Sequence, residues 1–286
     1  MSRGADLRGL GPARGDVGSP GLLDRVERSF YLELARSPVL DMVEECGVET
    51  RRYGPVLAVA VAGLPEEGRF NRVLCAAAPR AVSAAYLEEA LEWMESLGVR
   101  ARVPLTPGRS ETADAEAVLE RRGYRPQERR VRFLRPGGPP DFPEPPGIAV
   151  VEVEECVEGF SDIPGEALGL DLLAHSFLDC LPERSAWQSY LAYDCHGGLI
   201  ATASMFCHMD VAMLGFAGTH EDFRGQGAHL ALLRRRIADA QGPFCHALCA
   251  EVELSPAEAH DEPHPAIRNL VRTGFKQAAV REVWGW

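Results

Sequence analysis

The sequence predicts an α/β (α+β) protein of two domains, each a mixed, mostly antiparallel sheet flanked by helices. Segments in which apolar residues alternate with polar ones are typical of strands, and segments in which they recur every three or four residues are typical of helices. Both kinds of segment are interleaved along the whole chain, which favours mixed sheets covered by helices. The two halves also end alike, in "LERRGYRPQERRVRFL" and "LVRTGFKQAAVREVW". This weak internal similarity indicates a duplicated fold.

A segment rich in proline and glycine separates the two halves. Residues 134–147, "LRPGGPPDFPEPPG", hold six prolines and three glycines, a composition that interrupts helices and central strands. We therefore predict a flexible tail at 1–20, a first domain at 21–135, a linker at 136–147 and a second domain at 148–286.

The first domain is expected to alternate helices and strands. Helical spacing of apolar residues, with Ser83 as an N-cap and Gly98 and Gly123 as stops, marks its helices. The predicted helices lie at 21–36, 83–98 and 112–123. The predicted strands lie at 55–64, 70–78, 100–105 and 125–136.

The second domain is expected to follow a similar order. Glycines and Asp210 supply turns between three successive strands, and Gly274 ends the last helix. The predicted strands lie at 147–155, 189–198, 199–210, 211–219, 243–254 and 276–286. The predicted helices lie at 163–170, at 170–180, from about Gln226 or Gly227 onward, and at 264–274.

Composition excludes several classes of protein. The chain of 286 residues is 46% hydrophobic and 25% charged, with a net charge of -12, so a nucleic-acid partner is not expected. No apolar run is long enough to span a membrane, and the first residues lack the apolar core of a secretory signal. We therefore expect a cytoplasmic protein.

Cysteine usage favours free thiols in a reducing compartment. The chain has eight cysteines and no CxxC pair, and most of them sit within apolar runs, which is typical of buried thiols. Four residues are of types that can bind zinc: Cys207, His208, Cys245 and His246. Their spacing matches no zinc pattern. We therefore expect no metal.

The stretch "FRGQGAHLALL" carries the clearest chemical signal. Gly225 and Gly227 lie between a predicted strand and a helix, where backbone N–H groups without partners make an anion site. Glycines let an anion come close to the backbone, and Arg224 adds a charge at the rim. A Walker A loop is excluded because no Gly-Lys-Ser/Thr follows, and a dinucleotide loop because its third glycine position is Leu230.

This stretch resembles the Arg/Gln-x-x-Gly-x-Gly/Ala signature of the GCN5-related N-acetyltransferase (GNAT) family, and "AIRNLVRTGF" resembles that family's second coenzyme A segment. The resemblance covers residues from about 148 to 286. The first half has no such signature and reads "PRAVSAAYL" in its place, so it resembles a degenerate copy. The chain as a whole looks like a tandem GNAT protein with one working site.

The resemblance implies specific site residues. It places acetyl-coenzyme A (acetyl-CoA) against a bulged strand, the glycine turn and the last helix. The implied cofactor-binding residues are Phe216, Ala217, Gly218, Thr219, Arg224, Gly225, Gln226, Gly227, Ala228, His229 and Asn269. Two positions depart from the family pattern: His229 stands where Gly or Ala is usual, and Leu270 stands where a catalytic Tyr is frequent.

The catalytic base is less clear from the sequence. Glu251 and Glu253 are our best candidates, with Glu251 first, because both lie on one face of an apolar strand, although a solvated strand end explains them equally well. His220 is a second candidate for the base, although a loop histidine with no catalytic role is the simpler explanation of this residue. The run Arg234–Arg236 is expected to be a solvated face, from which at most one side chain reaches the adenosine phosphate.

The resulting expectation is an acyltransferase that moves an acetyl or longer acyl group from acetyl-CoA to the amine of a small molecule, as a monomer or homodimer. The alternative is a non-catalytic acyl-CoA-binding or partner-binding protein on the same fold. Leu270 and the degenerate first half favour this alternative. The first domain can also complete the acceptor pocket, since sites often form where domains meet.

Overall fold

The structure is a computed structural model that describes residues 20–75, 84–108, 112–208, 210–240, 245–254 and 264–286. The chain divides into two compact units. Of the described residues, the N-terminal unit holds those within 20–131, 253–254 and 279–286, and the C-terminal unit holds those within 132–252 and 264–278. Within the described residues, no helix is long and apolar enough to cross a membrane. The tail predicted at 1–20 lies, up to residue 19, outside the described part of the chain.

The N-terminal unit combines an antiparallel sheet with helices. Its elements are α1 (Pro20–Ala35), α2 (Leu40–Glu45), β1 (Val48–Tyr53), β2 (Val56–Val61), β3 (Arg72–Cys75), α3 (Ala84–Ser96), β4 (Val103–Leu105), α4 (Ala113–Arg121) and the first part of β5 (Arg125–Pro136). Strands β1, β2 and β3 pair antiparallel in that order. Strand β4 pairs antiparallel with the end of β11 (Lys276–Gly285).

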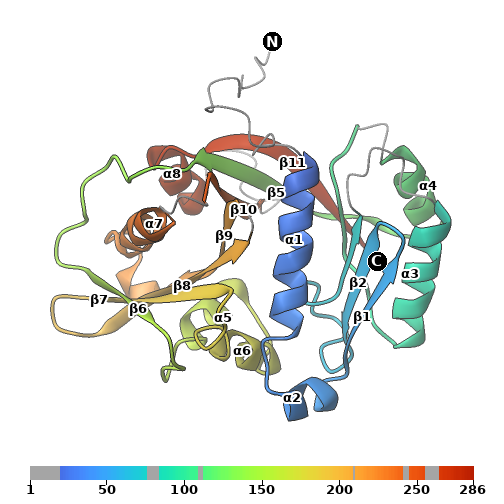
Figure 1. Cartoon of the computed structure of the whole chain (residues 1–286), viewed down its shortest axis with the longest axis horizontal. Coiled ribbons are helices and arrows are strands. Elements are labelled where there is room, and N and C mark those ends of the chain that lie inside the picture. Colours follow the sequence, from blue (N-terminus) through green and yellow to red (C-terminus); the bar gives the residue numbers. More distant parts are fainter. Residues whose placement is uncertain (1–19, 76–83, 109–111, 209, 241–244, 255–263) are drawn as a thin grey trace. The chain divides into compact units, whose positions relative to one another are not determined.

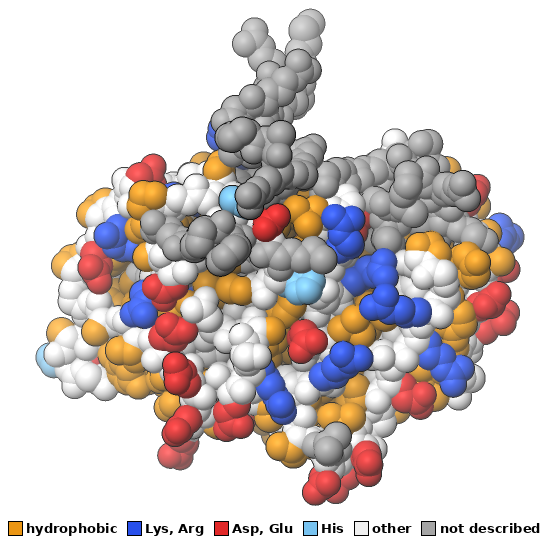
Figure 2. Space-filling view, in the orientation of Figure 1, with side chains coloured by type: hydrophobic (Ala, Val, Ile, Leu, Met, Phe, Trp, Pro, Cys, Tyr) orange, Lys and Arg blue, Asp and Glu red, His pale blue; other side chains and the backbone are white. Residues whose placement is uncertain are grey.

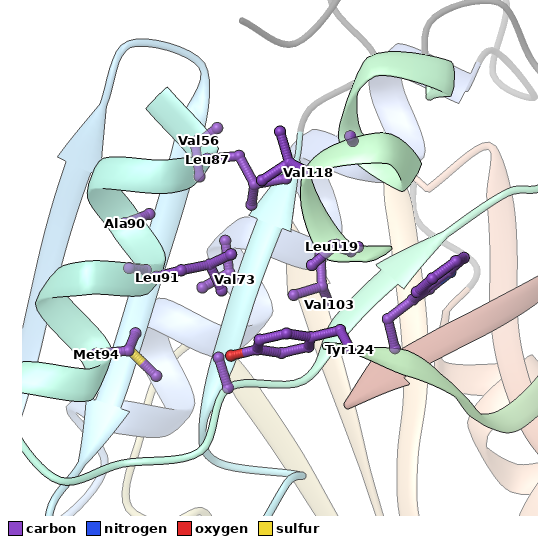
Figure 3. Packing of buried hydrophobic residues seen from close by; sticks show 14 of the residues in the cluster. Val56, Val73, Leu87, Ala90, Leu91, Met94, Val103, Val118, Leu119 and Tyr124 are labelled. Atoms are coloured by element: carbon purple, nitrogen blue, oxygen red, sulfur yellow. The ribbon is translucent and has the colours of Figure 1, made fainter. Parts of the chain in front are cut away.

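The core of this unit lies between its strands and helices α3 and α4. Val56 and Val73 from the strands join Leu87 and Leu91 from α3 in one buried cluster, which also takes in Val118 of α4 (Figure 3). Each large apolar side chain buried in this way contributes about 1.5–3 kcal/mol. The alternation of β2 explains the arrangement, because every second residue faces this cluster.

The C-terminal unit carries the segments that resemble the GNAT family. Its elements are the end of β5, β6 (Ala149–Val153), α5 (Asp162–Leu168), α6 (Leu172–Asp179), β7 (Trp187–Tyr193), β8 (Leu199–His208), β9 (Val211–Thr219), the 3-10 turn η1 (Glu221–Phe223), α7 (Ala228–Asp239), β10 (Ala247–Leu254), α8 (Pro265–Arg272) and the start of β11. Its strands lie in the order β10-β9-β8-β7-β6. Helix α7 covers one face of these strands, and α5 and α6 cover the other (Figure 1).

One pair of strands in this unit is parallel. Strand β10 runs parallel to β9, with Ala247 opposite Val211 and Ala250 opposite Leu214. In the described residues the parallel register ends there, while β9 continues to Thr219 and β10 to Leu254. The other neighbouring pairs, β6–β7, β7–β8 and β8–β9, are antiparallel. The predicted mixed, mostly antiparallel sheet is therefore confirmed.

Every helix and strand predicted from the sequence has a counterpart, shifted by a few residues at its ends. Gly98, Gly123 and Gly274 adopt positive φ of 71°, 84° and 85° after α3, α4 and α8, as glycines that end helices do. Ser83, the predicted N-cap, lies outside the described residues. The compact units divide within β5, between Val131 and Arg132, and again within β11. The domain boundaries drawn from the sequence stay a prediction.

Two elements of the N-terminal unit, α2 and β1, were not predicted. Strand β1 reads "VETRRY" and is exposed or half-buried throughout, so it lacks the apolar alternation that marks a half-buried strand. Its backbone pairing to the buried strand β2 holds it in place. Helix α2 has only six residues, which is too short for a periodic pattern.

Charges are mixed on the surface. Acidic and basic side chains are interspersed with apolar ones on the face shown in Figure 2. Opposite charges at short range offset each other, so the net charge of -12 does not appear on this face as a single acidic surface.

Candidate functional site

The glycine turn lies where the sequence places it, at the start of α7. Gly227 is the N-cap residue with φ 98°, and Gly225 has φ 80°. The N–H of Ala231 donates to the carbonyl of Gly227 over 2.9 Å, so the N–H groups of the preceding helical residues lie at the open end of the helix. The helix dipole makes this end positive. The turn can therefore bind an anion.

The two glycines are required for different reasons. Both have a backbone conformation that residues with a side chain rarely adopt. A Cβ at Gly225 would meet nothing within 4 Å, whereas a Cβ at Gly227 would lie 3.2 Å from the Cβ of Pro145. Residues of the predicted linker thus pack against the turn, and Arg234 holds them there by a hydrogen bond to the carbonyl of Phe142.

Two side chains of the turn donate hydrogen bonds to nearby backbone carbonyls. The Nε of Arg224 donates to the carbonyl of Thr219 over 3.3 Å, and the Nε2 of Gln226 donates to the carbonyl of Asp222 over 3.0 Å. Both side chains belong to exposed residues. They link the end of β9 and the residues after it to the turn.

Strand β9 carries the bulge expected between Phe216 and Thr219. Its register with β8 shifts between Thr202, opposite Gly218, and Ser204, opposite Gly215. Phe216 has φ 44° and is the one non-glycine residue with positive φ in the described part of the chain. Its ring lies 6.0 Å from that of Trp187, measured between centroids. An extra residue at such a bulge turns backbone groups out of the ladder.

Gly218 is required by a neighbouring helix. A Cβ at this position would lie 2.6 Å from the carbonyl oxygen of Ile163 in α5, a distance that no side chain tolerates. The glycine therefore lets α5 approach β9 closely.

His229 and Asn269 join the two segments that resemble coenzyme A-binding motifs. The Nδ2 of Asn269 lies 3.0 Å from the Nδ1 of His229. Burial, with smaller contributions from Arg236 and His264, lowers the pKa of His229 to about 3. The imidazole is therefore neutral near pH 7, and its Nδ1 accepts the hydrogen bond from the Asn269 amide. This contact ties α8 to the first turn of α7.

The three candidate bases have different surroundings. The side chain of Glu251 is 10% exposed and is held by Arg132 at 2.7 Å. The side chain of Glu253 is 44% exposed, with Arg130 at 3.3 Å. His220 is 41% exposed, and its Nδ1 accepts the backbone N–H of Asp222. Glu251 is the first residue of β10 after its parallel pairing to β9 ends. Of the three it therefore has the most protected position next to bulged β9.

The arginine run on α7 is not the solvated face that the sequence suggested. Arg236 is 1% exposed and donates to the carbonyls of Leu232 and Ser204. Burial lowers the pKa of Arg236 to about 10. Arg235 pairs with Asp239 at 2.6 Å. The correction follows from helix geometry, because three consecutive residues point in three directions and one of them points into the sheet.

Arg132 is a site residue that sequence reasoning missed. It is 4% exposed, and both its Nε and its Nη2 lie 2.7 Å from the Oε1 of Glu251. The available signal was the pair of arginines, Arg130 and Arg132, on one face of a partly apolar strand. That signal indicates a buried charge but not its partner, which lies 119 residues away in the chain.

Other groups considered from the sequence form no site in the described residues. No cluster of three or more His, Cys, Asp or Glu side chains suited to a metal is found there. Three cysteines, Cys156, Cys195 and Cys207, are exposed rather than buried. A pocket of about 500 Å³ is lined by residues that include Glu152, Glu183 and Trp187. None of the predicted site residues lines this pocket.

Solved structures share the fold of this chain. No model of a protein family matches it, and no curated protein matches its sequence. A GCN5-related N-acetyltransferase from Kribbella flavida is similar with a TM-score of 0.64 and 18% identity, over 93% of this chain and 96% of that one. Another, from Sphaerobacter thermophilus, has a TM-score of 0.53 and 18% identity over 84% and 75%.

A tandem GNAT protein from the clavulanic acid biosynthesis pathway is similar over 96% of both chains, with a TM-score of 0.52 and 17% identity. At these identities the likeness shows the fold. The chain therefore has the fold of GCN5-related N-acetyltransferases over most of its length, and the resemblance noted in its sequence is confirmed at this level.

Proposed function

We propose that the protein is an N-acetyltransferase that transfers the acetyl group of acetyl-CoA to the amine of a small molecule. The observation that carries the proposal is the arrangement in the C-terminal unit. A glycine turn caps α7, and the strand before it, β9, is bulged where its pairing to β10 ends. An anion site and a bulged strand suit the two ends of an acyl-coenzyme A.

The turn is the proposed pyrophosphate site. The backbone N–H groups from Gly225 to His229 surround the anion in this proposal, with Gln226 and Ala228 contributing through their backbones. Arg224 adds a charge at the rim. Asn269 acts through His229, since their hydrogen bond holds α8 against this end of α7. The pattern of donors fits a phosphate and requires no metal.

The chemistry is proposed to take place at the bulge. Acetyl-CoA supplies a thioester whose carbonyl carbon is electrophilic. A backbone N–H within Phe216–Thr219, the segment that includes Ala217, polarises the carbonyl oxygen. The amine nitrogen bonds to the carbonyl carbon, the C–S bond breaks and coenzyme A leaves as its thiolate, while Glu251, the proposed base, takes the proton that the amine loses. Leu270 is 2% exposed and has no proton to donate, so the proposal assigns no acid to α8.

A second candidate function is a non-catalytic acyl-CoA-binding or partner-binding protein. Two observations favour it. Leu270 replaces the tyrosine that is frequent in the family, and Arg132 occupies an oxygen of the proposed base. An ion-paired carboxylate takes up a proton less readily than one without a partner.

Turnover separates the two functions. The purified protein is incubated with acetyl-CoA and a panel of amines (a polyamine, an aminoglycoside, an arylamine and an amino-acid amide), and release of free thiol is followed. The enzyme proposal expects thiol release with at least one amine. It expects loss of that release in Glu251→Gln but not in Glu253→Gln, the neighbouring exposed carboxylate. Binding of acetyl-CoA without turnover across the panel would favour the second function.

A further inference from the structure

Glu251 is held in a way that an ordinary strand-end carboxylate is not. Its side chain is 10% exposed and that of Arg132 is 5% exposed. The Nε of Arg132 donates to Oε1 of Glu251 over 2.7 Å, and the Nη2 lies 2.7 Å from the same oxygen. Two donors on one oxygen restrict rotation of the carboxyl group and favour its ionised form.

The neighbouring carboxylate provides an internal comparison. Glu253, two residues along the same strand, is 44% exposed, and its contacts with Arg130 and Arg69 measure 3.3 and 3.7 Å. Water screens such a pair, and it restrains the carboxylate weakly. Of these two similar side chains on one face of β10, the one next to the end of the parallel register is therefore the less exposed, at 10% against 44%, and it is held by short contacts.

Burying this pair is costly, which argues for a role beyond packing. Moving two charges out of water costs more than their attraction returns unless the geometry is very good, and apolar residues of similar volume serve packing as well or better. Glu251 follows directly after Ala250, the last residue of β10 in register with β9. Strand β9 is the strand that carries the bulge.

The chain's first half supplies this arginine. Strand β5 begins in the N-terminal unit at Arg125 and continues into the C-terminal unit from Arg132 onward. We propose that Arg132 is a positioning residue of the acyl-transfer site, which fixes the orientation of the Glu251 carboxylate and holds it ionised. This rests on the function proposed above.

The charged groups that alternate on one face of each strand define the test. Glu128, Arg130 and Arg132 share one face of β5, whose other charged residues are Arg125, Arg129 and Arg135. Glu251 and Glu253 lie on β10, while the residues of β9 opposite β10 carry no charge. Arg132→Lys keeps a cation, Arg132→Met removes it, and Arg130→Met is the matched control on the same strand. The double variant Arg132→Met with Glu251→Gln leaves neither charge in place.

Each variant is assayed for thiol release from acetyl-CoA with the best amine of the panel, from pH 4.5 to 9, as kcat and KM. Acetyl-CoA binding by calorimetry and the thermal midpoint show that each variant is folded. In Arg132→Met we expect the acidic limb of kcat/KM to move to higher pH by about one unit or more, with the KM for acetyl-CoA unchanged. Arg132→Lys restores most of the profile, and Arg130→Met leaves it unchanged.

The double variant tests whether Arg132 acts through Glu251. If Arg132 acts through Glu251, Arg132→Met reduces kcat no further in the Glu251→Gln background. Independent, additive losses would overturn the inference, as would a folded Arg132→Met protein with an unaltered profile, and the proposed function would stand in both cases. Absence of thiol release by the unaltered protein with every amine would remove the proposed function, and this inference with it.

Discussion

Alanine at the two glycines of the turn should have unequal effects. Gly225 and Gly227 share a positive φ, of 80° and 98°. They differ in what surrounds them, because a Cβ at Gly225 meets open space and a Cβ at Gly227 meets Pro145 at 3.2 Å. Gly225→Ala therefore measures backbone strain alone. Gly227→Ala measures the same strain together with displacement of the segment that packs on the turn.

The magnitudes follow from these two terms. Placing a residue with a Cβ in the left-handed region costs about 1–2 kcal/mol, which is the loss of unfolding free energy expected for Gly225→Ala. Crowding a packed contact costs about 1–3 kcal/mol more, so Gly227→Ala should lose about 2–5 kcal/mol. The second variant should also bind acetyl-CoA less tightly, because the N–H groups of the turn move with Gly227.

Urea denaturation of the two variants and the unaltered protein measures the difference, provided the slopes of the three transitions agree. Calorimetric titration with acetyl-CoA follows on the same samples. Equal losses of stability in the two variants would refute the reasoning, since they would mean that the contact with Pro145 does not constrain position 227.

Three further predictions concern stability. Arg281→Met should lower the unfolding free energy by about 3–5 kcal/mol, because it removes the guanidinium that pairs with the buried carboxylate of Glu27 at 2.7 Å; urea titration showing a loss below about 1 kcal/mol would count against this. Gly218→Ala should cost about 1–3 kcal/mol, since its Cβ would lie 2.6 Å from the Ile163 carbonyl oxygen, and an unchanged thermal midpoint would contradict it. The pKa of His229, lowered from 6.5 to about 3, means that the unfolded chain binds more protons between these values. Stability should therefore fall as pH drops through that window, and fall less steeply in His229→Gln; equal slopes in pH-dependent urea titrations would contradict this.

Local signals in the sequence account for most of the fold. The buried strand β2 and helices α3 and α7 were predicted because each has a strong apolar pattern, and Gly98 and Gly274 marked helix ends that the structure confirms. Strand β1 was missed because its own residues are mostly charged, and its place depends on pairing with β2.

The site was predictable only where its signal is local in the chain. The turn at Gly225–Gly227 and the bulge at Phe216 are each formed by a short continuous segment. The spacing of glycines and the neighbouring strand pattern therefore predict them. The partner of Glu251 could not be predicted in this way. Arg132 lies 119 residues away, and only the folding of β5 beside β10 brings the two side chains together. The exposure expected of Arg236 was wrong for a similar reason, since burial depends on the sheet beneath α7.

The central claim is that the turn at the start of α7 binds an acyl-coenzyme A, and one titration tests it most directly. Acetyl-CoA is titrated by calorimetry into the unaltered protein, into Gly227→Glu and into Gly197→Glu. Gly197 is a control in the same unit, with φ 84°, and a Cβ added there would meet nothing within 4 Å. The account predicts binding by the unaltered protein and by Gly197→Glu. It predicts loss of binding in Gly227→Glu, because the glutamate carboxylate would occupy the phosphate position and repel the phosphate charge. Absence of binding by the unaltered protein, or equal binding by all three, would contradict it.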